Sequence, residues 1–193
     1  MYEYGTVIVS GWLLFLAVWL ISAIGAKPDV KERGFGSGRF LFWFWRAILA
    51  FFVIVLFGHD GRLDGFANLT FFSSGPMLGW LGAIFTLAGI GFAIWARFHL
   101  GRNWSSHPAH KKDHELVTSG PYRFVRHPIY TGMILALFGG LLTGDILSVL
   151  LFVILLTVFA LRIRKEEGIM LGLFPNQYPA YQARTKRLIP FVW

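Results

Sequence analysis

Long apolar stretches separated by short polar segments are the dominant pattern along this chain of 193 residues. Three stretches, at residues 7–24, 40–57 and 77–98, are each long enough to cross a bilayer as one helix. Two shorter stretches follow at residues 129–142 and 146–161. Because only three residues separate these last two, they predict a tight helical hairpin. The pattern therefore predicts an all-α integral membrane protein with about five transmembrane helices.

Composition supports the membrane assignment. Hydrophobic residues make up 55% of the chain and charged residues only 15%, which is too few charges to cover a soluble domain of this length. The 20 Phe and eight Trp suit a lipid-facing surface with aromatic belts. The absence of Cys excludes disulfides, thiolate metal sites and cysteine nucleophiles. Because Glu3 and no Lys or Arg precedes the first apolar run, we expect a retained span rather than a cleavable signal.

The connections between the apolar stretches are alternately rich and poor in Lys and Arg. Residues 25–39 hold four and residues 58–76 hold one, whereas residues 97–126 and 162–193 hold six each. By the positive-inside rule, we expect the N-terminus outside and a helical C-terminal tail in the cytoplasm. The net charge of +8 then reflects topology and anionic lipid heads rather than nucleic-acid binding.

The first polar cluster is "HELVTSGPYRFVRHPIYTG", residues 114–132, at the mouth of the fourth apolar stretch. Pro128 disfavours helix at His127, so we expect His127 to be extended or to cap the helix that follows. His127, Tyr122 and Tyr130 add ring faces and hydrogen-bond donors beside the free N–H groups of that helix start. The cluster suits a polar ligand with a carboxylate and an aromatic base. Plain interfacial anchoring is the alternative.

The second polar cluster is "RIRKEEGIMLGLFPNQYPAY", residues 162–181. Arg162 and Glu166 are four residues apart and share a helix face, while Glu167 is turned by about 100° on the same helix. A solvated charged helix leaving the membrane is the alternative interpretation. Since the hairpin joins its helices at the far side, we expect His127 to lie close to Arg162–Glu167.

These two clusters, together with "LGRNWS" at residues 100–105, resemble the isoprenylcysteine carboxyl methyltransferase family. Its wider group includes membrane phospholipid methyltransferases. The resemblance covers roughly residues 100–190. It divides the chain, within one structural domain, into three N-terminal transmembrane helices with their loops at residues 1–99 and a catalytic region at residues 100–193.

The resemblance implies S-adenosylmethionine as methyl donor, with S-adenosylhomocysteine as product, in a cytoplasm-facing pocket without a metal. It implies catalytic roles for Arg162 and Glu166, nearest the transferred methyl. The positions implied to bind the cofactor are His114, Leu116, Val117, Gly120, Tyr122, His127, Pro128, Tyr130, Glu167, Tyr178 and Tyr181. The last two tyrosines and Arg187 match a tail that closes over the cofactor. The chain departs from several relatives at Pro175, where they have Gly, and at Gly168, where they have a third acidic residue.

The expected activity is methyl transfer to a lipophilic or lipidated substrate, above all carboxyl methylation of an isoprenylcysteine-like or related apolar carboxylate. A phospholipid or amine N-methyltransferase is the first alternative, because the residues do not decide between a carboxylate and an amine acceptor. A membrane reductase with a nicotinamide cofactor is the second. A non-enzymatic scaffold or small transporter is the third, and transport is disfavoured because both polar clusters lie on one face and few charges lie within the spans.

Overall fold

The computed structural model describes residues 3–24, 72, 75–101, 115–144 and 146–190. The predicted span at residues 40–57 and the candidate residue His114 lie outside this part of the chain. The described residues are helical, apart from turns and one isolated parallel bridge between Val125 and Lys186. The all-α prediction is confirmed over the described residues.

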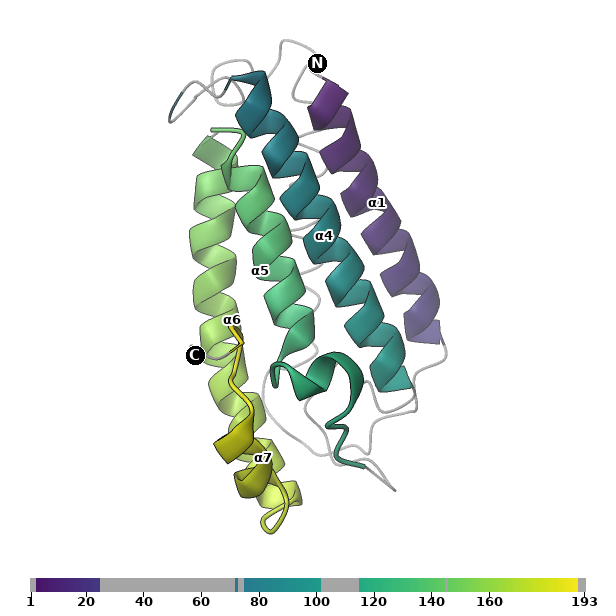
Figure 1. Ribbon diagram of the computed structural model, residues 1–193, viewed down its shortest axis with the longest axis vertical. Coiled ribbons are helices and arrows are strands. Elements are labelled where there is room, and N and C mark those ends of the chain that lie inside the picture. The colour runs from purple at the N-terminus through teal and green to yellow at the C-terminus, as the bar shows by residue number, and fades with distance from the viewer. Residues whose placement is uncertain (1–2, 25–71, 73–74, 102–114, 145, 191–193) are drawn as a thin grey trace.

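Within the described residues, four helices run side by side, and the shortest elements gather at one end of them (Figure 1). The elements in chain order are α1 (Glu3–Ile24), α4 (Pro76–Leu100), the 3₁₀ helix η2 (Gly120–Arg123), α5 (Pro128–Leu141), α6 (Ile146–Leu173) and α7 (Tyr178–Arg184). By length and composition α1, α4 and α6 are each able to cross a membrane, whereas α5 is a shorter apolar helix.

Proline and glycine mark the helix ends. Pro76 and Pro128 stand in the first turns of α4 and α5, where the missing N–H costs no helical hydrogen bond. Gly101, with a φ of 52°, ends α4, and its N–H bonds the last carbonyls of that helix. Helix α6 continues past the apolar stretch predicted at residues 146–161 to Leu173, and it carries Arg162, Glu166 and Glu167 on the same helix, as their predicted helical spacing requires.

Helices α4 and α5 pack so closely that their backbone atoms are in contact. A Cβ on Gly132 would lie 2.5 Å from the carbonyl oxygen of Gly89 and 2.6 Å from the amide nitrogen of Ala93. One turn away, Thr86 donates a hydrogen bond of 3.1 Å to the carbonyl of Ala136. Small residues permit this close packing in an apolar environment, where dispersion and interhelical hydrogen bonds hold helices together. The contact fixes the end of α4 relative to the start of α5.

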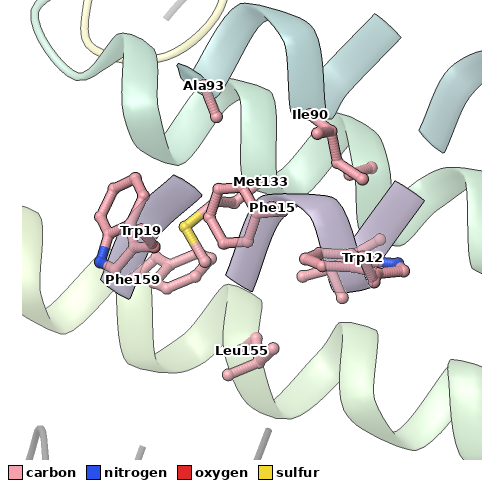
Figure 2. Close-up of a cluster of buried hydrophobic side chains, with 10 residues drawn as sticks. Trp12, Phe15, Trp19, Ile90, Ala93, Met133, Leu155 and Phe159 are labelled. Carbon is pink, nitrogen blue, oxygen red and sulfur yellow. The ribbon is translucent and has the colours of Figure 1, made fainter. Parts of the chain in front are cut away.

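Side chains from all four long helices form one apolar core (Figure 2). Phe15 of α1 is 1% exposed and Phe159 of α6 is 2% exposed, with Met133 of α5 between the helices. Tyr130 stacks on Phe159 with centroids 5.0 Å apart. The core thereby continues to the polar end of α5, where the candidate residues lie.

Adding one methyl group tests the α4–α5 contact. We expect Gly89→Ala to lower the free energy of unfolding by about 1–3 kcal/mol, because its Cβ would overlap the backbone of Gly132 and Ala136. Gly91→Ala is the matched control, since nothing lies within 4 Å of a Cβ at that position of the same helix. The two variants are compared by thermal unfolding in detergent, and equal Tm values would contradict the inferred packing.

Candidate active site

The candidate residues gather where α5 begins, beside η2, α7 and the C-terminal part of α6 (Figure 1). His127 is the N-cap of α5, with φ −124° and ψ 60°, and Pro128 follows at the first helical position. The predicted capping conformation of His127 is therefore confirmed. Its carbonyl accepts the first helical hydrogen bond from Thr131 at 3.0 Å. This geometry directs the His127 ring toward α6.

Glu167 of α6 is a buried carboxylate held by two arginines. Arg126, from the segment between η2 and α5, donates from Nε to Oε1 at 2.8 Å, and its Nη2 lies 2.7 Å from the same oxygen. Arg187, from the tail beyond α7, contacts Oε2 through Nε and Nη2 at 2.9 Å each. The Glu167 side chain is 5% exposed and that of Arg126 is 8% exposed. One carboxylate thus joins three segments that are distant in sequence.

Glu166 faces a different set of partners. Tyr130 donates its hydroxyl to Glu166 Oε1 at 2.6 Å, and Arg162 donates from Nε to the same oxygen at 2.8 Å. Arg162 and Glu166 are one helical turn apart on α6, as their spacing predicts. The carboxylate is more accessible than that of Glu167, with 22% of its side chain exposed. Two donors on one oxygen hold this carboxylate in a single orientation.

His127 lies between the two glutamates. Its Nδ1 is 3.7 Å from Glu166 Oε2, and its Nε2 is 3.5 Å from Glu167 Oε1. The side chain is 9% exposed, and Nε2 has no hydrogen-bond partner within the described residues. The predicted convergence of His127 with the Arg162–Glu167 segment is thus confirmed. A buried ring nitrogen without a hydrogen-bond partner is suited to bind a polar ligand group.

Backbone hydrogen bonds attach the tail to the segment that carries Arg126 and His127. The N–H of Arg126 donates to the carbonyl of Lys186 at 2.8 Å, and the N–H of His127 donates to that of Arg187 at 3.0 Å. The Arg126 guanidinium also donates to the Thr185 carbonyl. The tail is therefore fixed along its backbone as well as by the ion pair of Glu167.

A pair of tyrosines adds a second attachment. Tyr181 of α7 donates its hydroxyl to the carbonyl of Tyr122 in η2 at 2.6 Å, and both rings are buried. Tyr178 packs edge-on against Tyr181 with centroids 5.9 Å apart. Burial raises the pKa of Tyr122 and of Tyr181 above the ordinary value for tyrosine. The Tyr181 hydroxyl thus stays protonated, as its role as donor requires.

The remaining candidate residues lie in η2 and in the segment before it. Gly120, with a φ of 58°, begins η2, while Leu116 and Val117 are half-buried in the segment before it. Arg126 has no role in the sequence prediction, and Arg187 is assigned only to the tail. Arg126 directly precedes His127 in the sequence, but no local pattern pairs it with Glu167 in preference to the other arginines.

Comparison with known proteins agrees with this geometry. Residues 81–172 match the model of the isoprenylcysteine carboxyl methyltransferase family. The predicted resemblance to this family is confirmed. The match includes α5, the polar segment before it and all of α6 except its last residue.

Individual relatives extend the comparison. The chain is 38% identical over 101 residues to protein-S-isoprenylcysteine O-methyltransferase of Schizosaccharomyces pombe, covering 50% of this chain and 43% of the relative. It is 33% identical to the cobalt-zinc-cadmium resistance protein CzcN of Cupriavidus metallidurans, covering 76% of this chain and 62% of that protein. The chain spans less than two thirds of the length of both relatives.

The fold matches that of a solved eukaryotic intramembrane Ras methyltransferase, an isoprenylcysteine carboxyl methyltransferase. The TM-score is 0.53 and the identity 24%, over 84% of this chain and 55% of that one. The chain therefore has the fold of an integral, multi-pass membrane protein.

Removing the charge of Glu167 tests the attachment of the tail. We expect Glu167→Gln to leave Arg126 and Arg187 without a counter-charge, at a cost on the order of 3 kcal/mol, and to loosen residues 184–187. Limited trypsin digestion followed by mass spectrometry measures cleavage after Arg184 and Lys186. Lys165→Gln, an exposed change on the same helix, is the control. Equal cleavage rates in the two variants would contradict the role of this ion pair.

Proposed function

We propose that this protein is an integral membrane methyltransferase that uses S-adenosylmethionine to methylate an apolar carboxylate, such as the carboxyl group of an isoprenylcysteine. The observation that carries the proposal is the position of Arg162 and Glu166 beside a lipid-accessible apolar surface. Leu161 directly precedes Arg162 and is 62% exposed, and the part of α6 before it is exposed and apolar along much of its length. An apolar substrate can therefore reach the polar cluster from the bilayer.

The residues around His127 fit the proposed cofactor. The ring nitrogen Nε2 of His127 is buried without a hydrogen-bond partner within the described residues, and the rings of His127 and Tyr130 lie 5.9 Å apart at the same place. These groups suit the amino-acid part and the aromatic base of S-adenosylmethionine, which when bound supplies an electrophilic methyl group. We assign His127, Tyr122, Tyr130 and Tyr178 to the cofactor pocket, with Tyr181 closing it from the tail.

The orientation of Glu166 favours a carboxylate acceptor. An amine acceptor must lose a proton, and the base that takes it has to offer a free lone pair in the right direction. Glu166 already accepts from Tyr130 and from Arg162 on Oε1, and its other oxygen, Oε2, faces the His127 ring with Nδ1 at 3.7 Å. We assign it the role of orienting Arg162, whose guanidinium then holds the acceptor carboxylate. A carboxylate is ionised at pH 7, so no base is required for its attack on the methyl group.

The remaining task of the site is alignment. Methyl transfer requires the acceptor oxygen, the methyl carbon and the sulfur to lie in line, with competing water excluded. We assign this task to residues 100–193, and in particular to Arg162 and Glu166, whereas the attachment of the tail to η2 through Tyr181 closes the pocket over the cofactor. We place this face in the cytoplasm, with the N-terminus outside, because the basic residues concentrate there.

Cofactor binding tests the proposal directly. We expect purified protein in detergent to bind S-adenosylmethionine and S-adenosylhomocysteine in isothermal titration and to show no binding of NADPH. In sealed vesicles of known orientation, only cofactor on the cytoplasmic side should support methylation of a farnesylcysteine analogue. Binding of NADPH alone would favour the reductase alternative, and methylation of phosphatidylethanolamine in place of the carboxylate would favour the amine alternative.

The division of roles within the site gives a second test. We expect Glu166→Gln and Arg162→Ala to slow single-turnover methyl transfer about tenfold to 150-fold, because one charged hydrogen bond worth ~1.5–3 kcal/mol is lost in the transition state. Their affinity for S-adenosylhomocysteine should change little. We expect His127→Ala to weaken that affinity instead. Equal losses of rate and affinity in all three variants would contradict the assignment.

A further inference from the structure

His99, in the last turn of α4, touches the segment that leads into the candidate site. Its Nε2 lies 2.9 Å from the hydroxyl oxygen of Ser119, within hydrogen-bond distance. Its ring stacks on that of Tyr122, with centroids 6.4 Å apart and an interplanar angle of 27°. It also covers Gly120, where a Cβ would lie between 2.5 and 2.7 Å from three atoms of the imidazole. One side chain thus contacts three of four consecutive residues.

The part of α4 that carries His99 is itself fixed. Arg97, two residues before His99, is 3% exposed and donates to the carbonyl of Ser22 in α1 at 2.6 Å and to that of Gly101 at 3.2 Å. The small-residue contact with α5 holds the rest of the helix. The imidazole is therefore presented from a rigid frame, whereas residues 115–118 before η2 belong to no helix.

We propose that His99 is a positioning residue that sets the place of Ser119, Gly120 and Tyr122 and thereby the shape of the cofactor pocket. Tyr122 transmits this placement, because its carbonyl accepts the hydroxyl of Tyr181 from the tail. If the His99 ring is lost, η2 can shift away from α4, and the tail that bonds to it shifts as well. The predicted cost falls on cofactor affinity, because His99 contacts Ser119, Gly120 and Tyr122, whereas Arg162 and Glu166 lie on α6.

The predicted effect on cofactor binding rests on the proposed function, whereas the predicted effect on the position of η2 does not. Two separate measurements distinguish these effects. Calorimetric affinity for S-adenosylhomocysteine reports the pocket. The rate of trypsin cleavage after Arg123, an exposed residue of η2, reports the placement of η2 in protein without ligand.

We expect His99→Ala to weaken binding of S-adenosylhomocysteine about threefold to tenfold, as one lost hydrogen bond and one lost ring contact would. Cleavage after Arg123 should accelerate, while the single-turnover rate at saturating cofactor stays unchanged. His99→Gln keeps a donor and acceptor for Ser119, and His99→Phe keeps a ring over Tyr122. Each should restore part of the affinity, which a general loss of folded protein would not do.

A double variant tests the contact with Gly120 itself. Gly120→Ala places an alanine in the left-handed backbone region, which is unfavourable, and its Cβ displaces the His99 ring. We therefore expect this variant to bind S-adenosylhomocysteine more weakly and to be cleaved faster after Arg123. Adding His99→Ala removes the clash, and the combined defect should be smaller than the product of the two single effects. Gly101→Ala is the matched control, since Gly101 has a similar φ of 52° but nothing within 4 Å of a Cβ. We expect no such coupling between Gly101→Ala and His99→Ala.

The outcomes are distinct. If the unaltered protein binds no S-adenosylhomocysteine, the proposed function is wrong, and the trypsin data alone decide whether His99 places η2. If the unaltered protein binds and His99→Ala binds equally well with unchanged cleavage, the positioning role is wrong. If the effects of Gly120→Ala and His99→Ala simply multiply, the contact between these residues does not place η2, and the proposal is overturned.

Discussion

The arrangement of the site depends on one buried carboxylate. Glu167 has almost no access to water, and an ionised carboxylate in that position is strongly unfavourable unless positive groups surround it. Those groups come from two other parts of the chain, Arg126 before α5 and Arg187 after α7. The tail and the segment before α5 must therefore meet at α6. Because the backbone N–H of Arg126 also bonds to the tail, the ion pair and the backbone contact strengthen each other.

The close approach of α4 and α5 provides the rigid support for this meeting point. With no side chain at Gly89 or Gly132, the two backbones interlock, so that α4 cannot slide along α5 without overlap. His99 at the end of α4 and His127 at the start of α5 consequently keep a constant separation. Between them, residues 115–126 are attached to this frame by His99 at one side and by the start of α5 at the other, with the short helix η2 among them.

Features that depend on local sequence could be predicted from the sequence alone. Composition identifies the spans, Pro128 places His127 outside the helix, and a spacing of four brings Glu166 to Arg162. Features that depend on tertiary contacts could not be predicted in this way. The pairing of Glu167 with Arg126 joins segments that no local pattern connects, and several other arginines were equally available by charge. The charged part of α6, by contrast, was predicted to be helical from the spacing of Arg162 and Glu166, and its Glu, Lys and Arg residues are themselves good helix formers.

The two adjacent glutamates are suited to different tasks because their surroundings differ. Glu167 is countered by two guanidinium groups, so an approaching ligand can add little to its stabilisation, and its position is fixed by the fold. Glu166 is paired with Arg162 and with the neutral hydroxyl of Tyr130, beside an exposed apolar surface. Under the proposed function, a substrate carboxylate that approaches there would meet a guanidinium already oriented by Glu166, and desolvation by lipid would strengthen that attraction. Specificity for an anionic acceptor would then arise from the fixed direction of Arg162 and not from its charge alone, because basic residues are abundant elsewhere in the chain.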